Sequence, residues 1–215
     1  MSAEELYETD EERRAWWLRL PAVLISPVPV FAALRDDADE DASARQEPVL
    51  LLVLTGGIAG VLFTSVAGHL LDDPALDGLV VAVWAFLGGC LYGAAAFWFG
   101  GGALYAALHG FGSLGSYRRA RHLLALAGTP LVLSLVTYWP VKLIAYGGDV
   151  FRSGGADAGT GGRVFAWVGY AFFAWSAALL VVGIRAVHGW TWRRAVAATA
   201  TAALLPALLV VAAKL

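Results

Sequence analysis

The sequence predicts an all-α fold: a polytopic membrane helix bundle with five transmembrane helices, the N-terminus in the cytoplasm, the C-terminus outside, and a short interfacial helix in front. Three observations lead to this prediction, namely the composition, five long apolar runs and an uneven distribution of charge. Hydrophobic residues occupy 59% of the 215 positions and charged residues only 15%, whereas soluble domains carry about 25% charged residues. A water-soluble protein of this size cannot bury so much apolar surface, so the chain is expected in a bilayer.

The same composition excludes several other classes of protein. A single cysteine cannot form an internal disulfide, so a disulfide scaffold is excluded. The 15 Lys and Arg are balanced by 17 Asp and Glu, which leaves no basic excess for nucleic acid. The high apolar fraction also argues against a disordered chain.

Acidic residues divide the chain into two parts. Twelve of the 17 acids lie before residue 48, so we separate a polar cytoplasmic N-terminal segment, residues 1–47, from a five-helix transmembrane domain, residues 48–215. An apolar stretch of the segment is interrupted by prolines and begins with Arg and Trp, which favour the headgroup zone. We therefore expect an interfacial helix that docks a partner, senses anionic lipid or merely covers the bundle's cytoplasmic end. Its anchor residues are Arg13, Arg14, Trp16 and Trp17.

Five windows of about 20 apolar residues mark the predicted spans. They are residues 48–71, 79–108, 121–146, 164–186 and 193–213. The second window measures about 45 Å as a helix, more than the roughly 30 Å hydrocarbon core, so it must tilt, break or protrude, and Gly100–Gly102 is the favoured place for a break. The four-residue spacings of Gly56 with Gly60 and of Gly89 with Gly93 predict two helices that pack closely.

The basic residues predict the orientation of the bundle. Eleven of them lie in the N-terminal segment and in the turns after the second and fourth spans, and four lie on the opposite side. This split places the N-terminus in the cytoplasm and the C-terminus outside. The glycine-rich loop 147–162 on the outer side is expected to be a flexible surface linker.

Two similar motifs open the third and fifth spans: Ser-Tyr-Arg-Arg-Ala at 116–120 and Thr-Trp-Arg-Arg-Ala at 191–195. Each has a hydroxyl residue for helix capping, an interfacial aromatic and two arginines suited to lipid phosphates. Prolines further along, including Pro130, should loosen these helices. An alternative is that every inward-facing helix start takes this chemistry. The candidate lipid- or partner-binding residues are Arg118, Arg119, Arg121, Arg185, Arg193 and Arg194.

Side chains suited to catalysis are scarce. No acid lies inside a predicted span, whereas ion-coupled carriers mark their path with such groups. The segment Gly110–Gly115 has dinucleotide-loop spacing but follows no strand, so we interpret it as a flexible turn. We predict no enzyme, no catalytic residue and no cofactor. The metal site left as an alternative is zinc at His109, His122 and His188.

The arrangement of motifs resembles the Yip1 domain family, in its prokaryotic branch. The resemblance rests on Pro27 and Phe31 in a short polar N-terminus, five spans, and two runs at 117–130 and 175–195. It implies a five-helix integral membrane protein with a cytoplasmic N-terminus. Eukaryotic members act in membrane trafficking as scaffolds that bind small GTPases and one another. Their Asp-Leu-Tyr-Gly-Pro element is missing here, so that GTPase partnership is not part of the expectation.

Two functional hypotheses follow. The first is a non-enzymatic membrane scaffold or adaptor in the cell's inner (plasma) membrane, contacting anionic lipid or protein partners through its cytoplasmic face. The partners would be anionic headgroups, a second copy or other membrane proteins. The second is a passive lipid or small-solute conduit, whose groove could be lined by hydroxyl side chains. These are Thr55, Thr64, Ser65, Ser134 and Thr137.

Overall fold

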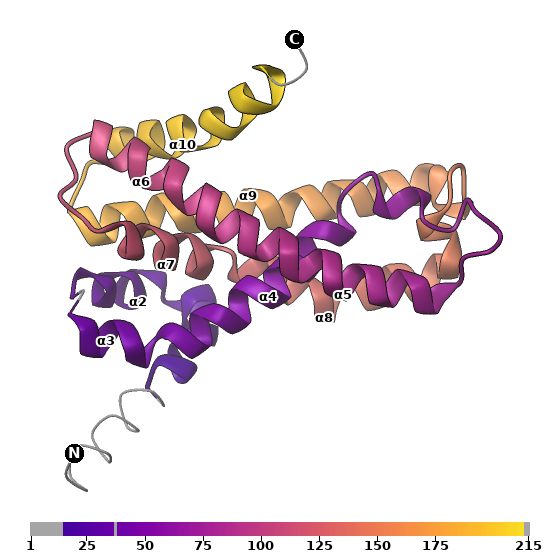
Figure 1. Ribbon diagram of the computed structural model, residues 1–215, viewed down its shortest axis with the longest axis horizontal. Coiled ribbons are helices and arrows are strands. Elements are labelled where there is room, and N and C mark those ends of the chain that lie inside the picture. Colours follow the sequence, from indigo (N-terminus) through magenta and orange to yellow (C-terminus); the bar gives the residue numbers. More distant parts are fainter. Residues whose placement is uncertain (1–14, 37, 213–215) are drawn as a thin grey trace, which may run out of the picture.

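The computed structural model describes residues 15–36 and 38–212, and every regular element in that part of the chain is a helix. This confirms the all-α prediction. After a first helix, Ala15–Ile25, the elements are α2 (Pro27–Ala32), η1 (Ala33–Arg35), α3 (Asp39–Ala44), α4 (Gln46–Leu62), η2 (Ala67–His69), α5 (Gly78–Ala95), η3 (Ala96–Gly100), α6 (Gly101–Gly110), α7 (Tyr117–Ala127), α8 (Thr129–Tyr146), η4 (Gly147–Phe151), η5 (Ala156–Ala158), α9 (Thr160–His188) and α10 (Trp192–Ala212). The long helices lie along the longest axis of the molecule (Figure 1).

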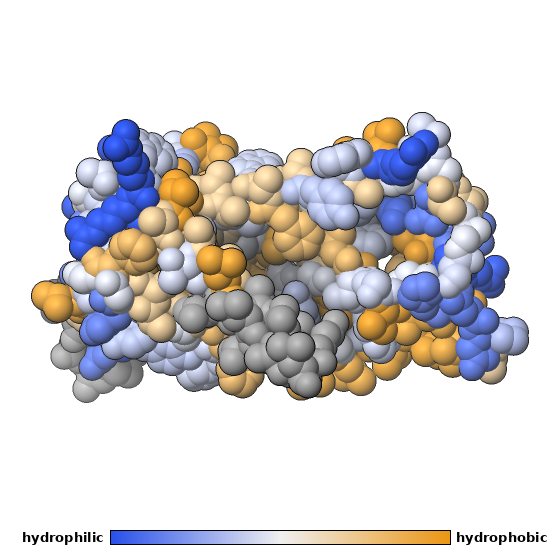
Figure 2. Space-filling model, turned by 90° about the horizontal axis from the view of Figure 1, so that it is seen from above, coloured by the Kyte–Doolittle hydropathy of each residue, from blue (hydrophilic) through white to orange (hydrophobic). Residues whose placement is uncertain are grey.

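Three continuous helical stretches are long and apolar enough to cross a membrane. They are Gly78–Gly110, Tyr117–Phe151 and Thr160–His188. The fourth predicted span corresponds to α9, while the first corresponds to α4, which has 17 residues, and the fifth to α10, whose side chains are described as far as Leu204. Large apolar side chains such as Leu91 and Ile144 are 74% and 85% exposed. Figure 2 shows a hydrophobic band between two hydrophilic ends, which is typical of a protein surrounded by lipid.

The second predicted span does not break at its three glycines. The helix continues from α5 through η3, a single π-helical segment, into α6, and Gly101 has ordinary helical angles of φ −61° and ψ −36°. The prediction of a break was wrong, because lipid offers no partner for the backbone groups that a break would expose. A π segment leaves carbonyls without their usual donors, and the hydroxyl of Tyr117 donates to the Trp98 carbonyl at 2.6 Å.

The third predicted span is divided by a loosened turn, as Pro130 predicts. Helix α7 ends at Ala127, and α8 restarts at Thr129 with the proline in its first turn. Proline is favoured there because its missing N–H has no intrahelical partner at that position. At the other end of α7 the Ser116 hydroxyl accepts from the Arg119 backbone N–H at 3.0 Å, so the predicted N-cap is also confirmed.

Helices α4 and α5 approach each other backbone to backbone. A Cβ added at Gly57 would lie 2.2 Å from the Gly89 carbonyl oxygen, and one at Gly93 would lie 2.1 Å from the Val53 carbonyl oxygen. The predicted close packing is therefore confirmed for Gly89 and Gly93. On α4, however, Gly57 makes the backbone contact, whereas Gly56 faces away, with only the Val132 side chain 3.7 Å from its added Cβ.

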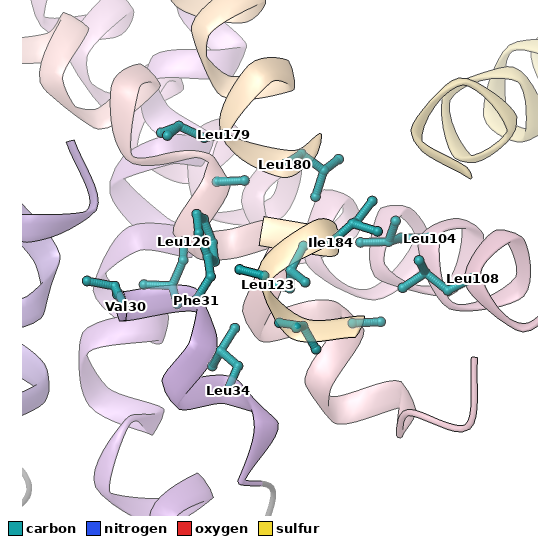
Figure 3. Packing of buried hydrophobic residues seen from close by; sticks show 14 of the residues in the cluster. Val30, Phe31, Leu34, Leu104, Leu108, Leu123, Leu126, Leu179, Leu180 and Ile184 are labelled. Carbon is teal, nitrogen blue, oxygen red and sulfur yellow. The ribbon is translucent and has the colours of Figure 1, made fainter. Parts of the chain in front are cut away.

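The N-terminal segment forms part of the bundle's core. Val30, Phe31 and Leu34 are buried against residues of α7 and α9, including Leu126 and Ile184 (Figure 3). The Phe31 ring lies against Gly183, where an added Cβ would come within 2.9 Å of it. The Phe31 ring therefore occupies the space that a side chain at position 183 would fill.

Trp16 is a core residue rather than the interfacial anchor that the sequence suggested. Its side chain is 2% exposed, and the guanidinium carbons of Arg19 and Arg45 lie 4.5 and 5.7 Å from its ring centroid. The ring is thus buried in the apolar cluster of the core and also has two cation–π contacts. Trp17 is partly exposed and stays a predicted anchor, while Arg13 and Arg14 lie outside the described residues.

The loop end of the bundle is formed by residues 63–77 and 147–159. The flexibility predicted for the linker 147–162 stays a prediction, but its first part is packed: Val150 and Phe151 are buried, with Phe151 stacked on Trp139 at 6.4 Å between ring centroids. Lys142 and Asp157 form an ion pair at 3.1 Å. The buried Val150 and Phe151 therefore attach the glycine-rich segment to the helices.

A hydrogen-bonded cluster joins the two loops of this end. The Ser153 hydroxyl and backbone N–H donate to the Asp72 carboxylate at 2.5 and 2.7 Å, and Nδ1 of His69 lies 2.5 Å from the same hydroxyl. These Ser153 bonds lower the pKa of Asp72 below its usual 3.8. Nδ1 of His69 also faces the carboxylate, whereas a catalytic triad uses opposite ring nitrogens for its hydroxyl and its carboxylate. We therefore interpret the cluster as a loop tie.

Candidate functional site

All six candidate arginines lie at one end of the bundle. Arg118, Arg119 and Arg121 belong to the first turns of α7, Arg185 to the last turn of α9, and Arg193 and Arg194 to the first turn of α10. We call this the arginine-rich end, formed by residues 27–45, 109–121 and 185–194. Figure 1 shows α2, α3 and the starts of α7 and α10 gathered there, opposite the loop end.

Some of these arginines bind carbonyl groups within the protein. Arg119 Nη2 donates to the Arg35 carbonyl at 3.0 Å, and Arg194 Nη2 donates to the Phe111 carbonyl at the end of α6. Arg35 itself donates through Nε and Nη2 to the Ala186 carbonyl in the last turn of α9. Carbonyls at helix ends have no intrahelical donor, so these contacts are helix caps.

Two arginines of this end, Arg185 and the capping Arg194, lie over aromatic rings. The guanidinium carbon of Arg185 is 4.7 Å from the Trp192 ring centroid, and that of Arg194 is 4.1 Å from Trp190. Arg185, Trp192 and Arg193 are all exposed. Exposed Arg–Trp pairs suit the headgroup zone, because the ring meets lipid while the cation meets phosphate.

Sequence reasoning missed a buried pair, Arg45 and His122. The Arg45 side chain is fully buried, and its Nε donates to His122 Nδ1 at 2.8 Å, while Nη1 donates to the Asp36 carbonyl at 3.0 Å. Since Nδ1 of His122 accepts, the neutral ring carries its proton on Nε2. Arg45 lies in a polar stretch of sequence, where no periodicity signals burial.

A cavity of about 470 Å³ lies between α3, α4, η3 and α7; its wall is largely apolar, and we call it the polar cavity for the cationic and hydrogen-bonding side chains that it also contains. Its wall includes Arg118, Arg121, His122, Gln46 and Asp39. Arg118 Nη1 forms an ion pair with Asp39 at 2.7 Å. The cavity therefore combines cationic and hydrogen-bonding side chains with apolar side chains of α4.

A second, apolar cavity of about 270 Å³ lies deeper, between α4, α5, α7, α8 and α9. Gly56, Leu131 and Ala177 are among its wall residues, and the buried Ser176 Oγ makes no hydrogen bond to the described residues. Cavities of a few hundred Å³ lined by apolar groups are suited to apolar ligands.

The hydroxyls expected to line a conduit do not face either cavity. Thr55, Thr64, Ser134 and Thr137 each donate to a backbone carbonyl three or four residues earlier in the chain. Such bonds satisfy the hydroxyl inside lipid without a channel. The conduit hypothesis therefore loses the polar path that motivated it.

The three histidines considered for zinc lie in separate environments. His122 binds Arg45, His188 Nε2 lies 2.8 Å from Ser113 Oγ, and the His109 ring packs on Tyr105. Within residues 15–36 and 38–212, no three His, Cys, Asp or Glu side chains form a group that could hold a metal ion. The segment Gly110–Gly115 forms a turn in which Gly112 has φ +82°, a conformation that favours glycine.

The fold, the lipid-facing surface and the polar ends define a helical integral membrane protein. The model of one family, the Yip1 domain, matches residues 22–214. The chain therefore belongs to the Yip1 family, as its motifs suggested. Searches of curated proteins and of solved structures found no match.

Proposed function

We propose that this chain is a non-enzymatic membrane scaffold or adaptor that contacts anionic lipid headgroups or protein partners through its arginine-rich end. The observation that carries the proposal is the exposed group of Arg185, Trp192 and Arg193 at the junction of α9 and α10. These two arginines are exposed, whereas Arg119 is half-buried and donates to a carbonyl group of the protein. The protein partners that we propose are a second copy of the chain or another membrane protein.

We further propose five spans, made by α4, the stretch α5 to α6, the stretch α7 to α8, α9 and α10. In this arrangement the arginine-rich end is cytoplasmic, the C-terminus lies outside, and the membrane is the cell's inner (plasma) membrane. The excess of basic residues at that end supports the orientation. The alternating direction of successive long helices in Figure 1 supports the number.

The test measures which lipids surround the protein in nanodiscs made from equal amounts of neutral and anionic phospholipid. The double variant Arg185→Gln/Arg193→Gln should reduce the enrichment of anionic lipid, because each arginine near an anionic surface contributes about 1 kcal/mol. The matched control is Arg152→Gln/Arg163→Gln at the loop end, which should leave the enrichment unchanged. Equal losses in both double variants would contradict a role specific to the arginine-rich end.

A further inference from the structure

The polar and apolar cavities lie end to end along helix α4. They share Val53 and Phe97 as wall residues. The lining positions of α4 run from Gln46 in the polar cavity to Gly60 in the apolar one, about 21 Å of helix at about 1.5 Å per residue. One leaflet of hydrocarbon is about 15 Å thick, so the two cavities together have the length of a headgroup and an acyl chain.

Two wall segments change from polar to apolar in the same direction. Helix α7 contributes Arg118 and Arg121 to the first cavity and Leu124 to the second. Helix α4 begins with Gln46 in the first cavity and continues with apolar residues and glycines, whereas the stretch from α5 to η3 is largely apolar along both cavities. This gradient matches the polarity of a phospholipid lying beside the bundle with its headgroup at the arginine-rich end.

Arg121 supplies a site for an anionic oxygen. Its guanidinium carbon lies 3.9 Å from the Trp98 ring centroid and 4.7 Å from that of Tyr117, so the aromatic rings cover its face and leave its edge for hydrogen bonds. Its Nε is buried and makes no hydrogen bond to any described residue. A buried donor without an acceptor is unfavourable, and Arg121 lines the polar cavity, so an acceptor oxygen of a ligand in that cavity would stabilise the guanidinium.

The surroundings of Arg121 favour a ligand that enters from lipid. Asp39 is the acid in the polar cavity, but it is paired with Arg118 and its side chain is 96% exposed. Leu50 and Trp98 at the wall are exposed apolar side chains, as are Tyr92 and Phe173 at the wall of the deeper cavity. Both cavities are therefore bordered by side chains that face hydrocarbon.

We infer that the chain binds one anionic phospholipid of the surrounding bilayer, with its phosphate at Arg121 and an acyl chain in the apolar cavity. The inference rests on the proposed function, since both assign anionic lipid to the arginine-rich end, and it narrows that contact to a single built site. The diffuse attraction of Arg185 and Arg193 is a separate interaction.

The test is native mass spectrometry of the full chain, titrated with phosphatidylglycerol or with phosphatidylcholine of the same acyl chains. The wild type should retain one phosphatidylglycerol in preference to phosphatidylcholine. Arg121→Gln should weaken phosphatidylglycerol binding about tenfold, and Arg121→Lys, which keeps the charge, should recover part of it. Ala177→Leu places a larger side chain in the apolar cavity and should weaken both lipids.

Two controls make the outcome specific. Arg193→Gln removes an exposed arginine of the same end, and Ala171→Leu enlarges an exposed residue of α9 that does not line the cavity; both should retain the tightly bound lipid. Equal binding of the two lipids, equal effects of Arg121→Gln and Arg193→Gln, or equal effects of Ala177→Leu and Ala171→Leu would each overturn the inference. If no single lipid binds tightly but anionic lipid is still enriched around the protein in nanodiscs, this inference fails and the proposed function stands. The failure of the inference is therefore distinguishable from the failure of the proposed function.

Discussion

The two ends of the bundle are closed by different interactions. At the arginine-rich end an apolar plug from the N-terminal segment, centred on Phe31, enters the core, and arginines cap helix ends from outside. At the loop end an aromatic cluster around Tyr138 and Trp139 is covered by loops that polar contacts tie together. At the arginine-rich end, apolar packing supplies the contacts that hold the helices together. Arginines that are not needed as helix caps are therefore available for ligands.

The largest expected effect is the loss of the plug. Phe31→Ala should lower the free energy of unfolding by about 3–5 kcal/mol, because a fully buried ring is lost over Gly183 and the seat cannot collapse. Phe151→Ala at the loop end should be milder, below about 3 kcal/mol, since its loop can relax. Denaturant unfolding in detergent measures both, and a larger loss from Phe151→Ala would refute the contrast between the ends.

Between the two ends, adjacent glycines of α4 should behave oppositely. Gly57→Ala should destabilise by about 3 kcal/mol, because the new Cβ meets the α5 backbone. Gly56→Ala should be neutral or stabilise by about 0.5–1 kcal/mol through helix propensity. Thermal unfolding of the two variants is the measurement, and similar melting temperatures would show that the faces of α4 are misassigned.

His122→Ala should have an intermediate effect at the arginine-rich end. It removes the acceptor of the buried Arg45 Nε, and a donor left without its partner costs about 1–3 kcal/mol. His122→Gln, which can present an acceptor oxygen, should recover part of the stability. The comparison of their unfolding free energies checks this, and no difference from the wild type in either variant would exclude a structural role for the pair.

The smallest effect concerns the loop tie. Because hydrogen bonds from Ser153 lower the pKa of Asp72 in the folded protein, the ionised carboxylate stabilises the fold above its usual pKa of 3.8. This stabilisation is lost as the pH falls through the lowered folded-state pKa. Asp72→Asn should therefore melt slightly below the wild type at pH 7 and together with it at pH 2. A difference that persists unchanged at pH 2 would contradict the assignment.

Local signals in the sequence predicted several elements correctly. Apolar windows located the long helices, Ser116 predicted a cap, and Pro130 predicted the turn between α7 and α8. These features depend on neighbouring residues alone, since capping and proline chemistry act within one turn of helix.

Other features depend on contacts between distant segments. The glycines near residue 101 suggested a break, yet an added Cβ at Gly101 would lie 2.3 Å from the Arg121 side chain, so the missing side chain makes room for this arginine of α7. The four-residue spacing of glycines predicted that α4 packs closely against another helix. It did not show that Gly57, rather than Gly56, contacts α5. The burial of Trp16 and Arg45 likewise arises from tertiary packing, which composition and periodicity do not encode.

The most direct test of the account is a map of which end of the bundle faces the cytoplasm. In a Cys90→Ala background, single cysteines replace Leu114 and Thr191 at the arginine-rich end, and Asp73 and Arg152 at the loop end; all four positions are exposed. A membrane-impermeant thiol reagent added to intact cells should label positions 73 and 152, and should label 114 and 191 only after permeabilisation. Labelling of both ends in intact cells, or of 114 and 191 alone, would contradict a membrane-spanning bundle with a cytoplasmic arginine-rich end.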